Sequence, residues 1–370
     1  MYLKNIYVSH FRNYDDFQVS FQPSINIIYG NNAQGKTNLL EAIYVLGMTK
    51  SHRSFIDNTL IQKNESTAYI QGNVVIQDQT ETLELGISKT KKLLKIDHNE
   101  VKKISDYISH MNLIIFYPED LDLIKGGPAL RRRFMNLELS QIYATYLDVL
   151  NDYNKLLKMR NDCLKQYVKG EYLDESYLSI LDQYFTSKAE LIYRMRKKFV
   201  DKLNQYVSEI FEDISGLKGF SLNYHTNIDL SIQCSYKDQL MEKLKKHHET
   251  EKKLGITLVG PHKDDLEFFL DGNLLKLYGS QGQQRMAVLA LKLAEIKLFQ
   301  DYKKDTPILL LDDVFSELDF HKRNNLLKHI SHHTQTIITT TELELLDPKL
   351  IENASLIHIH DGKLISKDEV

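Results

Sequence analysis

Cysteine is scarce in this chain, and long apolar runs are absent. Its 370 residues include two cysteines, Cys163 and Cys234, which lie far apart and in no metal-ligand spacing. This usage fits a reducing cytoplasm and argues against structural zinc. No run approaches the roughly 18 apolar residues of a membrane span. Residues 1–8 alternate like a strand and lack the apolar core of a signal peptide. We therefore expect a cytoplasmic protein without a membrane partner.

An excess of charge of one sign is also lacking. Lysine and arginine number 47 against 50 aspartate and glutamate residues, a net charge of −3. The overall charge therefore predicts no polyanionic partner, and a nucleic-acid surface must be a local patch. The 14 histidines are scattered. His358 and His360 would share one strand face, but no cysteine or carboxylate cluster is near, so a solvated strand edge is favoured over a metal site.

The distribution of glycine and proline indicates the domain organisation. Both become scarce after Gly126-Gly127-Pro128, where Tyr, Leu, Lys and Glu take over at helical spacing. We expect residues 1–117 and 255–370 to form one discontinuous α/β head. Residues 118–254 are expected to form an inserted α-helical lobe of short helical hairpins.

Alternating patterns predict antiparallel strands on both sides of the lobe. Residues 67–76 and 82–87 are expected to pair, and residues 93–101 to form a hairpin. A further hairpin with an Asp-Gly turn is expected over residues 265–277, inside the head.

The segment from Gly30 to Thr37 reads G-N-N-A-Q-G-K-T and matches G-x-x-x-x-G-K-T. A short strand pattern over residues 24–28 precedes it, and a helical pattern over 38–46 follows, with Gly47 as the expected C-cap. Such a strand, loop and helix cradle phosphates with backbone N–H groups, while the lysine reaches the β- and γ-phosphates and the threonine ligates Mg²⁺. The predicted nucleotide-binding residues are Gly30, Asn31, Asn32, Ala33, Gln34, Gly35, Lys36 and Thr37.

An apolar strand pattern over residues 307–311 ends in two carboxylates, Asp312 and Asp313. Doubly wound parallel sheets bind ligands at the carboxyl ends of their strands. Asp312 is expected to hold Mg²⁺ together with Thr37. Asp313 is the expected catalytic residue, which orients or deprotonates the attacking water. The structural alternative is that the two aspartates only cap the following helix.

The sequence S-Q-G-Q at residues 280–283 is a second candidate phosphate-binding helix end. Ser280 can cap the following helix, and Gly282 lets a ligand approach the backbone closely. One γ-phosphate can be clamped between two such helix ends if they belong to different subunits. Ser280, Gly282 and Gln283 form this predicted trans site; an ordinary capped helix is the alternative.

Taken together, these three elements resemble the motifs of the ABC-type ATPases. Residues 316–319, S-E-L-D, are similar to the D-loop of that superfamily, and the resemblance places Ser316 and Asp319 at the other subunit's nucleotide. Two departures are present: threonines and a glutamate at 340–342 replace the usual histidine, and Asp313 replaces the usual glutamate. Both favour slow hydrolysis, so we expect a weak ATPase that acts as a switch.

The resemblance narrows to the bacterial RecF family. The matching segments are H-F-R-N-Y (10–14), the phosphate loop, Y-P-E-D-L (117–121), G-P-H-K-D-D (260–265), S-Q-G-Q-Q-R (280–285) and L-D-D-V-F-S-E-L-D (311–319). The resemblance implies an ABC/SMC-like ATPase head, a P-loop α/β core with flanking antiparallel strands, plus an α-helical lobe. It also places Arg12 and Asn13 near the nucleotide.

The same resemblance implies a cytoplasmic DNA replication and repair protein that acts in gap repair, recombination and SOS induction after DNA damage. In the family, binding of ATP and Mg²⁺ promotes homodimerisation and DNA binding, and slow hydrolysis releases both. RecO and RecR are the implied partners, with loading of the RecA recombinase as the outcome. Single-stranded, duplex or gapped DNA is the implied substrate.

Basic residues in two clusters are candidates for the DNA surface, because lysine and arginine contact phosphates without reading sequence. The clusters are Lys125, Arg131, Arg132 and Arg133, and then Arg194, Arg196, Lys197 and Lys198. For either cluster a solvated helix face is an equally good interpretation. No sequence-reading motif is visible, which favours recognition of DNA structure or backbone.

Two other functions stay open at this point. A transporter ATPase subunit normally carries its signature much nearer the phosphate loop. A nucleotide-binding scaffold that never hydrolyses fits Asp313 and the missing histidine.

Overall fold

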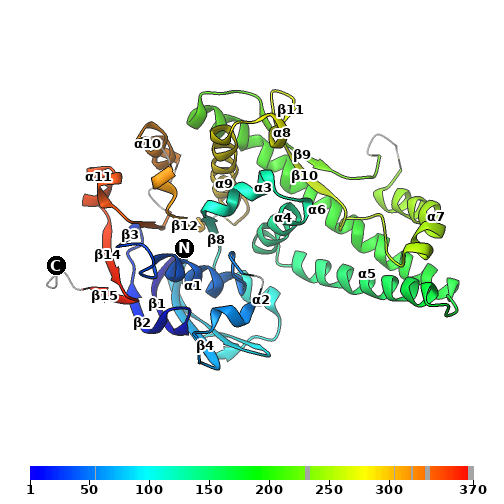
Figure 1. Ribbon diagram of the computed structural model, residues 1–370, viewed down its shortest axis with the longest axis horizontal. Helices are drawn as coiled ribbons and strands as arrows, with labels where there is room; N and C mark the ends of the chain where they lie inside the picture. The colour runs from blue at the N-terminus through cyan, green and yellow to red at the C-terminus, as the bar shows by residue number, and fades with distance from the viewer. Residues whose placement is uncertain (55, 230–233, 304, 318–319, 330–333, 366–370) are drawn as a thin grey trace. The chain divides into compact units, whose positions relative to one another are not determined.

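The chain forms two compact units in the computed structural model, which describes residues 1–370 except 55, 230–233, 304, 318–319, 330–333 and 366–370 (Figure 1). The head unit comprises Met1–Leu121, Glu209–Leu217 and Gln281–Val370, and the lobe unit comprises Asp122–Ser208 and Lys218–Ser280. The first part of the head ends at Leu121, close to the expected residue 117, and its last part begins at Gln281 and not at 255.

A six-stranded sheet forms the centre of the head unit, in the order β15-β14-β3-β13-β12-β8. Its strands are β3 (Ile25–Tyr29), β8 (Leu113–Phe116), β12 (Ile308–Asp312), β13 (Thr336–Thr340), β14 (Ser355–His360) and β15 (Lys363–Ile365). All neighbours pair in parallel except β14 and β15. The continuous apolar runs, such as the buried residues 308–311, suit a parallel sheet covered on both faces. The carboxyl ends of β3, β13 and β12 therefore lie along one edge.

A second six-stranded sheet of the head is antiparallel throughout, in the order β2-β1-β4-β5-β6-β7. Its strands are β1 (Tyr2–Phe11), β2 (Tyr14–Ser20), β4 (Thr67–Ile76), β5 (Gln79–Ser88), β6 (Lys92–Ile96) and β7 (Asn99–Glu100). The predicted strand pair and the hairpin that follows it are confirmed. A Cβ on Gly72 would lie 2.5 Å from Leu46 Cδ2 of the helix α1 (Lys36–Met48), so this sheet and that helix pack closely.

The helices of the head complete its core. Besides α1 they are α2 (Ile104–Ile108), α9 (Gln281–Lys303), α10 (Phe320–His329) and α11 (Pro348–Glu352), with short 3-10 turns at Asp57–Leu60, Pro118–Leu121, Val314–Glu317 and Leu343–Leu345. The prediction of Gly47 as C-cap was wrong: α1 runs on to Met48, and Thr49 is its left-handed cap. A Cβ on Gly47 would lie 2.7 Å from Leu113 Cδ1, so this glycine permits close packing on β8. Of the helices described, none is both long and apolar enough to cross a bilayer.

The lobe unit consists mainly of helices, as the sequence predicts. They are α3 (Asp122–Lys125), α4 (Pro128–Ile142), α5 (Tyr146–Val168), α6 (Glu175–Ser215, whose last turns belong to the head unit), α7 (Tyr236–Leu254) and α8 (Leu275–Tyr278). An antiparallel sheet of β9 (Phe220–His225), β10 (Asp265–Leu270) and β11 (Asn273–Leu274) accompanies them. Because β10 pairs with β9, this hairpin belongs to the lobe and not to the head. Its second strand ends at Leu274 and not at residue 277, because α8 begins at Leu275.

Candidate nucleotide-binding site

The phosphate loop, residues 30–37, joins β3 to α1 and requires glycine at two positions. Gly30 and Gly35 have φ angles of 146° and 113°, which side chains disfavour. Space is also lacking, since a Cβ on Gly30 would lie 2.3 Å from Ile359 O and one on Gly35 would lie 2.7 Å from Asn13 Nδ2. The backbone can therefore curve tightly into the first turn of α1, where free N–H groups form an anion site.

Lys36 lies across the mouth of this loop. Its Nζ donates hydrogen bonds of 2.7 Å to the carbonyl oxygens of both Gly30 and Asn31. Burial lowers the pKa of Lys36, and the negative charges of Asp313 and Asp312 counteract that shift. The ammonium is thus held by neutral acceptors, which the oxygens of a phosphate can replace.

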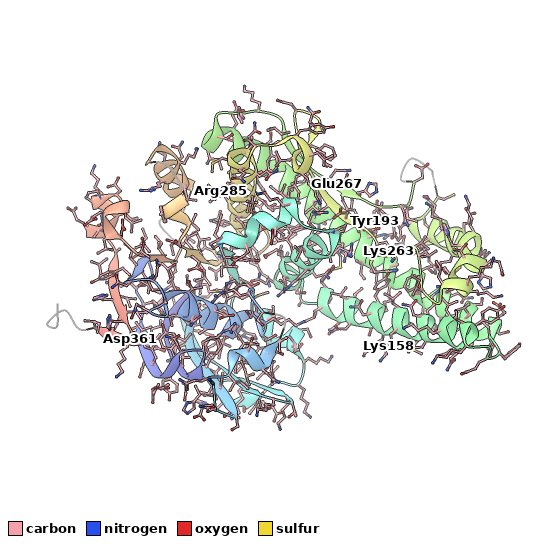
Figure 2. All side chains as sticks on the ribbon, in the orientation of Figure 1. Lys158, Tyr193, Lys263, Glu267, Arg285 and Asp361 are labelled. Atoms are coloured by element: carbon pink, nitrogen blue, oxygen red, sulfur yellow. The ribbon has the colours of Figure 1, made fainter. Side chains whose placement is uncertain are left out.

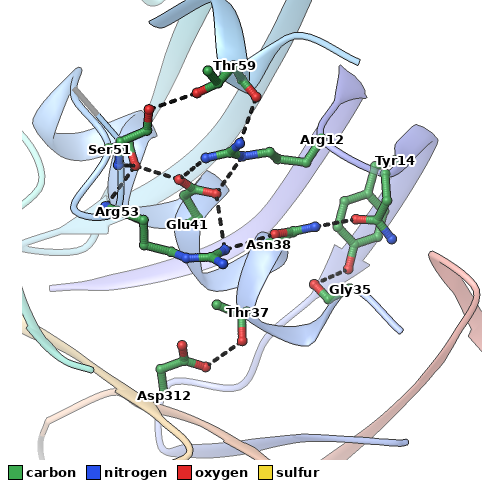
Figure 3. Close-up of polar contacts among 12 residues, drawn as sticks. Arg12, Tyr14, Gly35, Thr37, Asn38, Glu41, Ser51, Arg53, Thr59 and Asp312 are labelled. Carbon is green, nitrogen blue, oxygen red and sulfur yellow. Dashed lines mark hydrogen bonds and ion pairs between the residues drawn. The ribbon is translucent and has the colours of Figure 1, made fainter. Parts of the chain in front are cut away.

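Thr37 and Asp312 meet at the carboxyl edge of the sheet, as Figure 3 shows. Thr37 Oγ1 donates a 2.9 Å hydrogen bond to Asp312 Oδ1, and Thr339 Oγ1 of β13 donates one of 2.7 Å to the same oxygen. Burial raises the pKa of Asp312, and these two hydrogen bonds counteract it. The sequence pattern did not identify Thr339 as a site residue, because it resembles any other threonine of a strand.

Asp313 follows β12 in the left-handed conformation, with a φ of 53°. Its N–H donates a 3.0 Å hydrogen bond to Thr339 Oγ1. Asp312 and Asp313 together line a cleft with about 530 Å³ of open space. The other walls come from the end of β8, the turn after it, and α9, which contributes Arg285 (Figure 2). Asp312 and the predicted catalytic carboxylate of Asp313 therefore share one cleft, and Thr37 reaches Asp312 through the 2.9 Å hydrogen bond.

Arg12 and Asn13, which the resemblance places near the nucleotide, lie beside α1. The Arg12 guanidinium makes hydrogen bonds of 2.8 and 2.7 Å to the two carboxylate oxygens of Glu41 and one of 2.7 Å to Thr59 O (Figure 3). Glu41 is fully buried, and although burial raises its pKa, the hydrogen bonds from Arg12 and Ser51 hold the pKa below its usual value. Arg12 therefore braces the helix that carries the phosphate loop. A direct nucleotide contact by either residue stays a prediction.

The C-terminal hairpin supports the same loop from the other end of the chain. Figure 1 shows β14 and β15, in red, beside the blue strands of the N-terminal sheet. Gly362 N–H donates to Gln34 O at 3.0 Å and Asp361 N–H to Gln34 Oε1 at 2.5 Å. Tyr14 Oη donates a 3.0 Å hydrogen bond to Gly35 O. No local pattern in the sequence indicates these contacts, because the partners are far apart along the chain.

The predicted trans residues lie where α9 begins. Ser280 and Gly282 are exposed, and a Cβ on Gly282 would meet no atom within 4 Å. This open helix end suits an anion site, but its engagement by a second subunit stays a prediction. Of the predicted D-loop, Ser316 belongs to the 3-10 turn Val314–Glu317, and Asp319 lies outside the described residues.

Two of the arginines expected to bind DNA are buried in the lobe, so that expectation is corrected. Arg131 forms a bidentate pair with Asp265 at 2.7 and 2.8 Å. Arg196 is 2% exposed and donates hydrogen bonds to Tyr146 Oη at 3.1 Å and Pro261 O at 2.7 Å. Their guanidinium groups cannot reach a DNA phosphate while these interior contacts persist.

The remaining basic residues of the two clusters are more accessible. Lys125, Arg194 and Lys198 are exposed, whereas Arg132, Arg133 and Lys197 are half-buried. Some have partners: Arg194 pairs with Glu190, Lys197 with Asp201, and Arg132 donates to Asp264 O. Exposed ion pairs of this kind contribute little stability and exchange readily, so these side chains stay candidates for DNA contacts.

The G-P-H-K-D-D segment, residues 260–265, lies largely in the interior of the lobe. His262 Nδ1 accepts a 2.6 Å hydrogen bond from Tyr153 Oη, and Nε2 lies 3.1 Å from Thr257 O. Burial lowers the pKa of His262 to about 4, so the imidazole is neutral. We name these interior groups the lobe polar core; its members are Arg131, Tyr153, Arg160, Arg196, Glu251, His262, Asp264 and Asp265. The segment therefore organises the lobe interior.

Known proteins are similar to this chain over nearly its whole length. The model of the RecF/RecN/SMC N terminal domain family matches residues 2–362. The DNA replication and repair protein RecF of Bacillus subtilis (strain 168) is 41% identical over 369 residues, covering 99% of this chain and 100% of the relative. This chain belongs to the RecF family. RecF of Staphylococcus aureus (strain Newman) is likewise 40% identical over 369 residues, with 99% and 100% coverage.

Solved structures agree with the RecF assignment. A structure of the recombination mediator protein RecF-ATP in the RecFOR pathway has a TM-score of 0.91 at 33% identity and covers 98% of this chain and 97% of that chain. An Smc head bound to the C-winged helix domain of ScpA has a TM-score of 0.53 at 15% identity, covering 99% and 98%, and it shows the fold alone. The predicted ABC/SMC-like ATPase head is confirmed, and the RecF relatives support DNA replication and repair over a transporter subunit.

Proposed function

We propose that this RecF-family chain is an ATP-dependent DNA-binding protein of recombinational repair and replication. The observation that carries the proposal is the assembly of Lys36, Thr37 and Asp312 at the carboxyl edge of one parallel sheet. A relative solved with ATP, similar over nearly the whole chain, supports ATP as the nucleotide.

The residues present fit a Mg²⁺–ATP complex. Thr37 Oγ1 and Asp312 Oδ1, 2.9 Å apart, are hard oxygen donors of the kind that Mg²⁺ prefers. When bound, the ion neutralises charge on the β- and γ-phosphates. Lys36 would exchange its two carbonyl acceptors for phosphate oxygens, and Asp313 would orient the attacking water from the cleft.

A second copy of the chain would complete the site. Ser280, Gly282 and Gln283 would present the open N-terminus of α9 to the partner's γ-phosphate, with Ser316 and Asp319 nearby. ATP then joins two heads and slow hydrolysis separates them, which makes the protein a switch with weak ATPase activity.

DNA and other repair proteins are the proposed partners. The solved relative is described as a recombination mediator of the RecFOR pathway. By that relationship we infer a cytoplasmic role with RecO and RecR in gap repair and SOS induction, assisting RecA loading on single-stranded, duplex or gapped DNA. The exposed members of the basic clusters, Lys125, Arg194 and Lys198, are the proposed phosphate contacts.

The test follows dimerisation and DNA binding in parallel, with and without ATP, on gapped, single-stranded and duplex DNA. We expect dimers and tighter DNA binding only with ATP. Ser280→Arg should bind ATP as a monomer but form no ATP-dependent dimer in sedimentation, whereas Ser221→Arg, at an exposed lobe position, should dimerise normally. A failure of the wild-type chain to bind ATP would overturn the proposal, and normal dimers of Ser280→Arg would remove the trans site.

A scaffold without hydrolysis is the second candidate, because Asp313 is shorter than the usual glutamate. Single-turnover hydrolysis by the wild type and by Asp313→Asn separates the two. Equal rates favour the scaffold, and a slower Asp313→Asn favours the switch.

A further inference from the structure

Thr339 makes hydrogen bonds to both aspartates at the end of β12. β13 lies between β3 and β12, and its register puts Thr339 directly opposite Asp312. The Thr339 side chain is buried, with 1% of the residue exposed. Its Oγ1 is 2.7 Å from Asp312 Oδ1 and 3.0 Å from Asp313 N. One hydroxyl thus touches both residues expected to handle the metal and the water.

The directions of these hydrogen bonds follow from chemistry. A hydroxyl has one proton to donate. A carboxylate oxygen at 2.7 Å is a stronger acceptor than Leu311 O at 3.5 Å, so the proton points to Asp312. The hydroxyl oxygen then accepts the N–H of Asp313, which leaves β12 with a positive φ.

Thr37 of the phosphate loop donates to the same oxygen of Asp312. Asp312 Oδ1 therefore receives two hydroxyl hydrogen bonds, and these fix the orientation of the carboxylate. Without the Thr339 hydroxyl, one of the two restraints is lost, and so is the acceptor of the Asp313 N–H.

We propose that Thr339 is a positioning residue of the Mg²⁺–ATP site, which locks Asp312 and Asp313 in one geometry before the ligand arrives. The inference rests on the proposed function, because it assigns Thr339 a role in the same site. A restraint of this kind acts through Asp312, so it strengthens the part of ATP binding that depends on Mg²⁺. The contact of Lys36 with the phosphates should not change.

The matched control lies on the same strand. Thr336 is equally buried, and its Oγ1 donates to Thr334 O at 3.2 Å, at the far end of β13 from the aspartates. Thr336→Val removes one buried hydroxyl from β13 without touching the site. If the loss of a buried hydroxyl acts only by destabilising β13, the variants at positions 336 and 339 should therefore show the same effect.

The experiment measures equilibrium ATP binding with excess Mg²⁺ and with EDTA, together with melting temperatures without nucleotide. For Thr339→Val we expect the Mg²⁺-dependent gain in ATP affinity to fall about tenfold, the range of one hydrogen bond to a charged group, with unchanged affinity in EDTA. Thr339→Ser should restore the gain, and Thr336→Val should keep it. If Thr339→Val has a lower melting temperature than the wild type, Thr339→Ala is the second test, because it adds no methyl group beside the carboxylate. It must show the same loss of the Mg²⁺-dependent gain in ATP affinity.

Either of two results overturns the inference while the proposed function stands: a full Mg²⁺-dependent gain in both folded Thr339 variants, or an equal loss in Thr336→Val. If the wild-type chain binds no ATP, both the inference and the proposed function fall.

Discussion

The phosphate site of the head and the polar core of the lobe both bury charged side chains, but they satisfy those charges differently. In the lobe, the Arg160 guanidinium contacts Asp182 and Glu251, each at 2.7 Å, and donates to Thr257 Oγ1 at 2.8 Å. In the head, Lys36 is held by two backbone carbonyl groups of the phosphate loop. A closed network of opposite charges builds structure, whereas a charge held by exchangeable neutral acceptors suits a ligand.

The comparison also explains why a cluster of basic residues in the sequence is a poor predictor of a DNA-binding surface. Arg131 and Arg196 share their segments with exposed basic residues, yet their guanidinium groups have interior partners. An arginine can bind DNA only if its guanidinium has no partner in the protein interior. That partner can be far away in the sequence, so the local pattern does not reveal it. The following predictions test this distinction.

The largest effect is expected from breaking the lobe network at Arg160. Arg160→Met leaves Glu251, which is fully buried, without its arginine. Loss of one partner of a buried pair costs about 3–5 kcal/mol, and chemical denaturation of the variant should show it. Arg160→Met combined with Glu251→Leu should be less destabilised than the single variant. A single variant as stable as the wild type would contradict this account.

The next largest effect is expected at Lys36, and it should fall on binding and not on stability. Lys36→Met removes the charge that grips the phosphates, so ATP affinity should drop by about 100-fold, the range of one or two hydrogen bonds to a charged group. The melting temperature without nucleotide should change much less than for Arg160→Met, because Lys36 gives up two neutral acceptors and the attraction of Asp312 and Asp313 but no direct ion pair. Calorimetric titration with ATP checks the first part, and exposed Lys4→Gln is the control. A large loss of stability would show that Lys36 belongs with the structural charges.

A pH-dependent effect is expected at Asp120, which lines the cleft and is buried. Burial raises its pKa from 3.8 to about 6, against the attraction of Lys292. The folded state therefore holds this proton more tightly than the unfolded chain, and the stability from Asp120 is lost as pH rises through about 6. Asp120→Asn should be more stable than the wild type at neutral pH, by at most about 3 kcal/mol.

That advantage should approach zero at about pH 3, below the ordinary aspartate pKa of 3.8, where the wild-type carboxyl is mostly protonated in both states. Urea denaturation at the two pH values measures it, with exposed Asp16→Asn as the control. A constant advantage at both pH values would contradict the assignment of the pKa.

The smallest effect is expected at the exposed lysines of the lobe. Lys198→Gln should weaken DNA binding on every DNA substrate and reduce the slope of log affinity against log salt by about 1. Lys4→Gln, on the head, should leave the slope unchanged. An unchanged slope for Lys198→Gln and Lys125→Gln alike would move the DNA surface elsewhere.

Much of the site was predictable because its residues are neighbours in sequence. Gly30 to Thr37 carry their geometry locally: two glycines at strained φ angles, a strand before them and a helix after them. Asp312 and Asp313 were predictable for the same reason, since a buried apolar strand ends at them. The prediction of Gly47 as C-cap failed because tertiary packing against β8 continues α1 past it.

The domain boundary near residue 255 and the role of Thr339 were not predictable in this way. β10 joins the lobe because it pairs with β9, about 40 residues earlier, and the hydroxyl of Thr339 reaches Asp312 because β13 happens to be the neighbouring strand. Neither strand pairing can be predicted from the local sequence pattern.

The sequence by itself determined the family, the phosphate loop and the order of the elements, because these depend on residue type and short spacing. Only the tertiary structure decided which charges are available. It buried Arg131 and Arg196 against partners such as Asp265 and Pro261, which lie 134 and 65 residues away, and left Lys125 and Lys198 exposed. It also gathered Lys36, Asp312 and Thr339 at one edge of the sheet. Desolvation and ion pairing depend on every neighbour in space, so they exist only once the chain has folded.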